Sequence, residues 1–249
     1  MSDPPRVFYA LEILAPPWQT TQMPASPKTA APKQAVPRKR STKPAPEVAP
    51  DPFNEICTVR IELLHTEPLI WREVEAPTSI SLQVLHDIVQ IAMGWHDSHL
   101  WDFRIAGLTY GPPMESFFDL EPPRLAAKTR LRDVLRPRKT RIDYLYDMGD
   151  SWKHRLTVSH VRQGEPGGCY PRFVAGEWAG PPEDCGGLPG FYEVLDALAD
   201  PKHPEHAAIK EWHNGYDPAH IDATRINFLL GRISNRRAAG RARSPKPQP

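Results

Sequence analysis

The sequence has few cysteines and no long apolar run, and both absences narrow the class of protein. Its 249 residues include three cysteines, Cys57, Cys169 and Cys185, and no Cys-x-x-Cys pair. We therefore expect neither a disulfide scaffold nor a four-cysteine zinc site, and a reducing, cytoplasmic environment fits best. No stretch approaches the ~18 consecutive apolar residues of a membrane helix, so no membrane segment is expected. The apolar run 7–15 is interrupted by Glu12, which argues against a secretory signal.

Common catalytic motifs are also missing. The sequence contains no Gly-x-Ser-x-Gly nucleophile turn, no phosphate-binding P-loop and no His-Glu-x-x-His zinc motif. The common hydrolase, nucleotide-binding and zinc-protease classes therefore receive no support. From motifs of this kind we assign no catalytic residue, no metal and no cofactor.

Proline and charged residues divide the chain into an acidic centre and two basic ends. Thirty prolines are more than twice the average share of about 5%. Residues 1–52 hold twelve of them with seven Lys/Arg and four Asp/Glu, and residues 232–249 hold six Lys/Arg and no acid. Residues 53–231 carry 18 basic and 26 acidic side chains, a net charge of −8. We expect disordered basic tails at 1–52 and 235–249, because such segments bury too little apolar surface to offset chain entropy.

Three roles for these tails stay open. They are solvated disorder without a partner, electrostatic arms for nucleic acid or another acidic partner, or proline-rich segments through which the chain acts as an adaptor. The acidic centre argues against a nucleic-acid-binding face on the folded domain itself. No particular protein partner is indicated.

The centre of the chain, residues 53–234, predicts one α+β domain. Apolar residues at Val59, Ile61 and Leu63 alternate with polar ones and indicate a strand over 57–64. Apolar residues at helical spacing predict a helix that Ser81 begins and Gly94 ends. Further strands are expected at 69–74, 100–105, 108–110, 141–146 and 152–158, a Gly/Pro-rich loop at 164–190, and helices near 131–135 and at 191–199, 206–213 and 223–234.

This order of elements predicts a mixed or antiparallel sheet with a packed helix and C-terminal helices, and not alternating βαβ units. A hairpin followed by a helix laid across the sheet resembles the β-grasp arrangement. His86 lies on the apolar side of the predicted helix, where a hydrogen-bonded core histidine is expected.

The densest polar segment is 146–154, which reads Tyr-Asp-Met-Gly-Asp-Ser-Trp-Lys-His. Asp147 and the residues after it predict a tight turn, because Asp side chains bond nearby backbone N–H groups. Strand alternation beyond the turn places Asp150, Trp152 and His154 on one face. These side chains either bind a metal ion or polar ligand, or form a hairpin turn with a packed Trp and a hydrogen-bonded His.

A second segment, 94–103, follows the predicted helix. It offers two imidazoles three residues apart, His96 and His99, together with two carboxylates and the indole of Trp95. Zinc accepts His and Asp ligands, so the segment is chemically adequate for a metal. The alternative is a helix-to-strand corner beneath which His99 packs.

A third segment, 181–187, reads Pro-Pro-Glu-Asp-Cys-Gly-Gly. Its prolines and glycines hold Glu183, Asp184 and Cys185 just before the helix expected at 191. The loop either caps that helix or presents acids to a ligand or metal. Cys185 is not expected to be a nucleophile, because the flanking acids raise the pKa of its thiol.

Together these segments resemble the plasmid pRiA4b Orf-three-like family. The motifs that carry the resemblance are Pro68-Leu69-Ile70-Trp71-Arg72, Leu82-x-x-Leu85-His86, residues 94–100 with Phe103, residues 146–152 with His154, residues 181–187, and Asn227. They occur in this order across 58–230, and the basic tails lie outside them. The resemblance implies a compact α+β domain of bacteria or archaea and a link to insertion elements, whose passenger proteins the family includes. It implies no reaction.

The chain departs from this family in its cysteines. Members often carry Cys near the position of Phe173, then Gly, here Gly176, and a small residue or Cys near Gly180. The nearest thiols in this chain are Cys169 and Cys185. A thiol-based metal site is therefore not carried over.

Three functions remain as hypotheses. The leading one is a non-catalytic binding or accessory protein linked to mobile DNA. The alternatives are a metal-dependent enzyme, a hydrolase or nuclease that uses an Asp/His/Glu cluster, and an adaptor acting through the proline-rich tails. The candidate ligand-binding residues are Trp95, His99, Asp147, Asp150, Trp152, His154, Glu183 and Asp184. If they serve one site, the three segments must converge on one concave surface.

Overall fold

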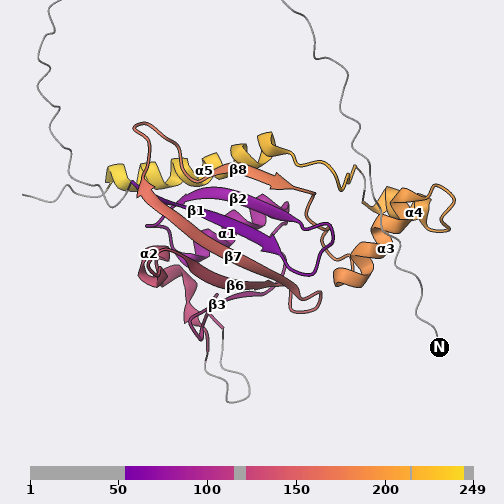
Figure 1. The fold of residues 1–249 in the computed structure, drawn as a ribbon, viewed down its shortest axis with the longest axis horizontal. Helices are drawn as coiled ribbons and strands as arrows, with labels where there is room; N and C mark the ends of the chain where they lie inside the picture. Colours follow the sequence, from indigo (N-terminus) through magenta and orange to yellow (C-terminus); the bar gives the residue numbers. More distant parts are fainter. Residues whose placement is uncertain (1–53, 115–121, 214, 244–249) are drawn as a thin grey trace, which may run out of the picture. The chain divides into compact units, whose positions relative to one another are not determined.

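A computed structural model describes residues 54–114, 122–213 and 215–243. In this part of the chain, eight strands form one mixed sheet in the order β5-β4-β3-β6-β7-β1-β2-β8 (Figure 1). The strands are β1 (Glu55–Leu63), β2 (Trp71–Pro77), β3 (Trp101–Ile105), β4 (Leu108–Gly111), β5 (Arg124–Leu125), β6 (Thr140–Tyr146), β7 (Trp152–Gln163) and β8 (Arg172–Glu177). The paired neighbours are antiparallel except β4 and β5, which are parallel. The predicted α+β class with a mixed sheet is confirmed.

Five α-helices and one 3-10 helix complete the described residues. They are α1 (Leu82–Met93), the 3-10 helix Ala126–Lys128, α2 (Leu131–Val134), α3 (Gly187–Ala199), α4 (His206–Trp212) and α5 (Ala223–Arg243). Figure 1 shows α5 running along the β8 edge of the sheet, and α3 and α4 together at one end. The C-terminal helices therefore frame one edge and one end of the sheet.

Helix α1 begins and ends at the residues that the sequence predicts. The Ser81 hydroxyl oxygen accepts a hydrogen bond from the backbone N–H of Val84 over 3.3 Å. At the other end Gly94 is left-handed, with φ 89°, and its N–H donates to the Gln90 carbonyl. Because a left-handed residue favours glycine, this position turns the chain sharply out of the helix and toward the polar corner at 94–100.

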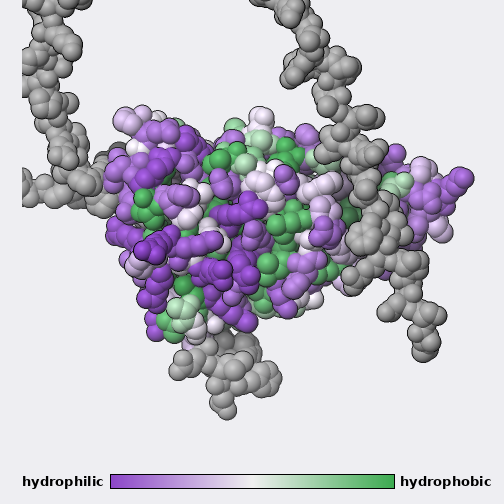
Figure 2. Space-filling model, in the orientation of Figure 1, coloured by the Kyte–Doolittle hydropathy of each residue, from purple (hydrophilic) through white to green (hydrophobic). Residues whose placement is uncertain are grey.

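The core lies between α1 and one face of the sheet. In β1 the side chains of Val59, Ile61 and Leu63 are fully buried, whereas Arg60 and Glu62 on the opposite face are partly exposed. This alternation follows from the period of two in a strand. The face seen in Figure 2 is accordingly covered by many hydrophilic side chains.

Several elements differ from the sequence prediction, and three of the differences concern β8, α3 and α5. Strand β8 lies inside the segment predicted as a long loop, because its glycine and irregular burial hide the period of two. Helix α3 begins at Gly187, before the predicted start at 191. Helix α5 continues through Arg243, well past the predicted end at 234, because Arg and Ala sustain a helix without an apolar stripe. Residues 235–243 are therefore helical, and the remaining tail residues, 1–52 and 244–249, lie outside the described part.

Candidate functional site

The corner between α1 and β3 carries His99 and is anchored by Trp95. The Trp95 indole N–H donates to the Pro181 carbonyl over 2.8 Å, and its ring stacks on Tyr146 with centroids 4.8 Å apart. Trp95 is 6% exposed, so it serves as a buried support and not as an open ligand platform. It thereby joins the corner to β6 and to the loop that holds Glu183.

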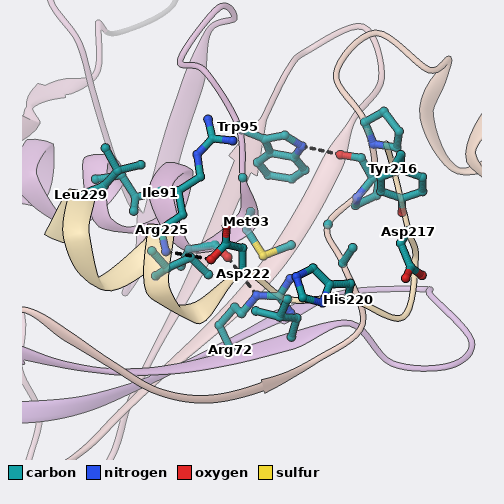
Figure 3. Close-up of a pocket in the computed structure, with 18 of the residues that line it drawn as sticks. Arg72, Ile91, Met93, Trp95, Tyr216, Asp217, His220, Asp222, Arg225 and Leu229 are labelled. Atoms are coloured by element: carbon teal, nitrogen blue, oxygen red, sulfur yellow. Dashed lines mark hydrogen bonds between the residues drawn. The ribbon is translucent and has the colours of Figure 1, made fainter. Parts of the chain in front are cut away.

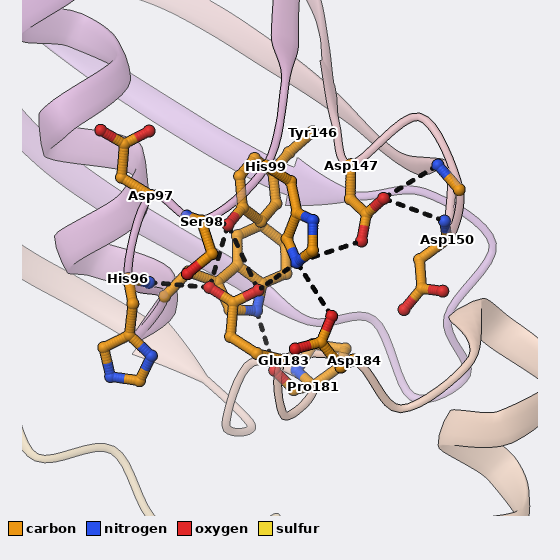
Figure 4. A network of polar contacts seen from close by, with 12 residues as sticks. His96, Asp97, Ser98, His99, Tyr146, Asp147, Asp150, Pro181, Glu183 and Asp184 are labelled. Carbon is orange, nitrogen blue, oxygen red and sulfur yellow. Dashed lines mark hydrogen bonds and ion pairs between the residues drawn. The ribbon is translucent and has the colours of Figure 1, made fainter.

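The turn between β6 and β7 positions Asp147. Its Oδ1 accepts hydrogen bonds from the backbone N–H groups of Gly149, over 2.8 Å, and Asp150, over 3.2 Å. Asp147 is buried and left-handed, with φ 55°. One carboxylate oxygen is thus used by the turn, as the sequence predicts, and Oδ2 is left to face His99 (Figure 4).

The loop before α3 is pressed against both of these segments. A Cβ on Gly180 would overlap the Met93 carbonyl oxygen, and one on Gly187 would lie 2.8 Å from the Asp150 carbonyl oxygen. The Asp150 carboxylate also accepts the N–H of Gly186 over 3.2 Å. Glycine is required here because the loop backbone closely approaches the end of α1 and the β6–β7 turn.

These elements bring one imidazole and three carboxylates together. His99 Nε2 lies 3.0 Å from Asp184 Oδ1, 3.6 Å from Asp147 Oδ2 and 3.8 Å from Glu183 Oε2 (Figure 4). We call His99, Asp147, Glu183 and Asp184 the polar cluster. Its members come from three segments that are far apart in the sequence. The structure brings these four side chains together, and the concave surface expected around them stays a prediction.

Glu183, like Asp147, is held by hydrogen bonds from other groups of the protein. Its Oε1 accepts hydrogen bonds from the backbone N–H of His96 over 2.7 Å and from the Tyr146 hydroxyl over 3.0 Å. The same hydroxyl accepts the N–H of Ser98 over 3.1 Å. Burial, reinforced by Glu183, raises the pKa of Tyr146, so its hydroxyl remains a donor to the carboxylate.

The Nε2 atom of His99 is the atom of the polar cluster that is both buried and without a hydrogen bond among the described residues. It has no partner of suitable geometry among these residues, despite the short distance to Asp184. A buried polar atom without such a partner costs free energy. An ion or ligand atom placed among the carboxylates would satisfy it.

The distances in the polar cluster fit a metal ion. The ligand atoms of His99, Asp147 and Asp184 all lie within 4.8 Å of one another. Zinc bonds of about 2.0–2.2 Å in a tetrahedron separate ligand atoms by roughly 3.3–3.6 Å, close to the distances from Nε2. The spacing of these atoms is therefore compatible with one bound ion.

Two predicted residues face the core and not the polar cluster. Trp152 and His154 are 1% and 0% exposed. They point to the buried side of β7, and the residue between them points to solvent. Burial lowers the pKa of His154 to about 3, so its imidazole is neutral. Asp150 lies in the turn before β7 and accepts the Gly186 N–H, so strand alternation does not apply to it, and its predicted place on one face with Trp152 and His154 stays a prediction.

Cys185, the cysteine in the loop before α3, has a weakly acidic thiol. Burial raises the pKa of Cys185 to about 12, and the nearby Asp150, Asp184 and Glu183 add to the shift. The thiol therefore stays protonated, as the sequence analysis expected. The core role expected for His86 is also confirmed, since its two ring nitrogens pair with the Tyr144 hydroxyl and the Asp97 carboxylate.

Sequence reasoning did not single out two polar side chains that the structure makes prominent. Tyr146 supports Glu183 from the strand residue just before Asp147, where it looked like an ordinary core position. Arg72 is 2% exposed, although its strand motif reads as alternating. The sequence does place a charged residue at an inward-facing strand position, and this could have marked Arg72 as a functional candidate.

The fold and the polar cluster define an α+β domain whose loops gather at one end of a mixed sheet. The chain belongs to the family described as plasmid pRiA4b ORF-3-like protein, which matches residues 55–225. The uncharacterized protein y4hQ of Sinorhizobium fredii is 34% identical over 178 residues, covering 69% of this chain and 89% of that protein.

A solved structure shares the fold. It is the protein of unknown function MM3350 from Methanosarcina mazei Go1, with a TM-score of 0.63 and 27% sequence identity over 69% of this chain and 97% of that chain. Among the described residues, no helix is long and apolar enough to cross a membrane.

Proposed function

We propose that this protein binds a divalent transition-metal ion, with zinc as the best match, at His99, Asp147 and Asp184. Imidazole nitrogen and carboxylate oxygen are both zinc ligands. The observation that carries the proposal is the buried Nε2 of His99, which has no hydrogen bond within the described part of the chain and faces carboxylate oxygens at 3.0–3.8 Å. Three such ligands leave a coordination position open for water or a bound molecule.

Glu183 gives the proposed metal site a further chemical capacity. Its carboxylate is fixed by Tyr146 and by the backbone of His96, and its Oε2 is 3.8 Å from His99 Nε2. A fixed carboxylate beside an open metal position can accept a proton from bound water. The hydrolase or nuclease alternative requires both a bound metal ion and a fixed carboxylate beside it. Metal binding is therefore the first test of that alternative.

Metal titration of the purified full chain tests this proposal. After chelator treatment and dialysis, calorimetry with zinc chloride should give one site per chain. The His99→Gln variant should bind at least tenfold more weakly. The matched control is His96→Gln, an exposed histidine of the same corner whose side chain lies outside the polar cluster. Equal zinc affinity of wild type and His99→Gln would overturn the proposal.

An accessory role on mobile DNA is a second proposal, and the composition of α5 favours it. The helix sequence contains six arginines and no acid, and Arg225, Arg232 and Arg236 are exposed. Such a helix attracts phosphates through counterion release. We infer a cytoplasmic accessory protein that contacts nucleic acid through this helix and the basic tails.

Salt-dependent DNA binding tests the accessory role. Replacing Arg232 and Arg236 with Gln should weaken binding and reduce the slope of log affinity against log salt by about two. A control variant with Gln at Arg141 and Lys153, two exposed basic residues of the sheet, should bind like wild type. If both double variants behave alike, the role of α5 is refuted.

A further inference from the structure

A cavity separate from the polar cluster contains a buried hydroxyl without a hydrogen bond among the described residues. It has a volume of about 330 Å³ and is enclosed by the end of α1, the loop at 179–182, residues 215–222 and the start of α5. Figure 3 shows Arg72 below this cavity, Ile91 and Leu229 on one side and Tyr216 on the other. We call it the Arg72 cavity.

Arg72 is a buried cation whose hydrogen bonds go to backbone carbonyls. Its Nε donates to the Ala92 carbonyl over 2.8 Å, and Nη1 donates to the carbonyls of Trp71, over 2.7 Å, and Glu177, over 2.9 Å. Among the described residues, Nη2 donates no hydrogen bond to the protein, and no carboxylate forms an ion pair with the guanidinium. Burial lowers the pKa of Arg72 to about 10, so the side chain is still charged at neutral pH.

The Tyr216 hydroxyl is a second donor without a partner. Its oxygen is buried and has no hydrogen bond within the part of the chain that the structure describes. Burial raises the pKa of Tyr216, and the Arg72 charge partly offsets this, so the two groups influence each other across the same interior. Both face a cavity that both residues line.

The acids that line the Arg72 cavity are committed elsewhere. Asp217 accepts the backbone N–H of Ala219 over 2.9 Å, and Asp222 accepts that of Arg225 over 2.8 Å at the start of α5. They hold the turn and cap the helix. Among the described residues, neither forms an ion pair with Arg72, and the Tyr216 hydroxyl has no hydrogen bond.

Much of the remaining wall is apolar, and His96, His220 and Arg225 also line the cavity. Ile91 and Met93 of α1 face Ile226 and Leu229 of α5 around the cavity. Such a lining suits a hydrocarbon group, while Arg72 and Tyr216 suit an anionic oxygen. The combination selects a small molecule with one charged end and one apolar end.

We propose that the Arg72 cavity binds a small organic carboxylate. One carboxylate oxygen accepts hydrogen bonds from Arg72 Nη2 and the Tyr216 hydroxyl, and the hydrocarbon part packs between Ile91, Ile226 and Leu229. Nε and Nη1 of the guanidinium are already used by carbonyls, so the contact to Arg72 runs through Nη2 alone. The proposal does not depend on a metal ion in the polar cluster.

Calorimetry and ligand-observed NMR on the full chain test the proposal with defined probes. Phenylacetate, benzoate and hexanoate supply the carboxylate, phenylacetamide has the shape of phenylacetate without its charge, and inorganic phosphate has the charge without the apolar part. At least one carboxylate should bind, and phenylacetamide and phosphate should bind at least tenfold more weakly than the best carboxylate. Absence of binding by all three carboxylates at millimolar concentration overturns the proposal, and so does equal binding of phenylacetate and its amide.

Variants locate the binding. Tyr216→Phe removes a hydroxyl that makes no protein hydrogen bond, so it should leave the fold intact and weaken the best carboxylate by roughly tenfold, the usual effect of losing a bond to a charged group. The matched control is Tyr192→Phe, whose hydroxyl accepts the Glu67 N–H away from the cavity and should leave affinity unchanged. Arg72→Lys is a supporting variant. Its carboxylate affinity is interpreted only if thermal unfolding shows that the variant is folded. Unchanged affinity in Tyr216→Phe would overturn the assigned contacts.

Discussion

The Tyr146 hydroxyl donates a hydrogen bond to Glu183 Oε1 over 3.0 Å and so ties the last residue of β6 to the loop before α3. Tyr146 is fully buried, and its ring stacks on Trp95. The core of the domain therefore fixes the orientation of an acid at the surface. The position of Glu183 therefore depends on the packing of Tyr146. Removal of the Tyr146 hydroxyl oxygen tests this dependence.

Tyr146→Phe should loosen Glu183 while it preserves the stacked ring. We expect a loss of about 1–2 kcal/mol in the free energy of unfolding, because the hydroxyl also accepts the Ser98 N–H. Zinc affinity should fall only a few-fold, since Tyr146 is not a proposed ligand. Urea unfolding and zinc calorimetry measure the two effects. Tyr192→Phe is the control, and a Tyr146→Phe protein as stable as that control would contradict this assignment.

Gly180→Ala should be strongly destabilising. The added Cβ would overlap the carbonyl oxygen of Met93 at the end of α1, so either the loop or the helix end must move. We expect a cost of about 2–4 kcal/mol, together with loss of the polar cluster geometry. Gly231→Ala is the matched control, because its Cβ meets nothing within 4 Å and lies in a helix, where Ala is favoured by roughly 0.5–1 kcal/mol. Chemical denaturation of both variants should therefore give shifts of opposite sign.

Helix α1 and strand β8 differ in how well the local sequence predicts them. Helix α1 was predicted with its true ends because Ser81 and Gly94 act locally, through one cap hydrogen bond and one left-handed residue. Strand β8 was missed because it pairs only with β2 and carries a glycine next to Arg72. Its existence depends on a partner strand about a hundred residues earlier, which no local pattern reports.

For the polar cluster too, local sequence predicts some features, and others depend on distant packing. Local turn and loop chemistry marked Asp147, Glu183 and Asp184, and the structure brings them to His99. Trp152 and His154 were grouped with them because alternation tells which residues share a face, but it does not tell which face is buried. The choice of face is made by packing against α1, and that information lies outside the strand.

Acid should destabilise the protein through its two buried histidines. Burial lowers the pKa of His86 to about 4 and that of His154 to about 3, against about 6.5 in an unfolded chain. Between these values the unfolded state binds a proton that the folded state does not, so stability falls as the pH drops below about 6.5. Each histidine contributes a slope of up to about 1.4 kcal/mol per pH unit, which disappears below its folded-state pKa.

Urea unfolding at pH 7, 6 and 5 measures this slope, and imidazole NMR signals identify its source. The ring signals of His86 and His154 should show the neutral form at pH 5. The His96→Gln variant, which alters an exposed histidine, should retain the same slope. Stability that is constant from pH 7 to pH 5, or imidazolium signals from both buried rings at pH 5, would contradict the prediction.

Zinc should stabilise the fold, and Asp147→Asn should abolish that effect. The amide of Asn retains an oxygen that can accept the N–H groups of Gly149 and Asp150, so the turn is preserved. It replaces Oδ2, which faces His99, by an NH₂ group that cannot bind a cation. At an ion concentration one hundredfold above the dissociation constant, wild type should gain about 2.7 kcal/mol, measured as a shift in urea unfolding. The control, Asp143→Asn, alters an exposed acid of β6 and should gain as much as wild type. A zinc-dependent gain that persists in Asp147→Asn would place the ion elsewhere, because binding that stabilises the folded state must be lost with its ligand.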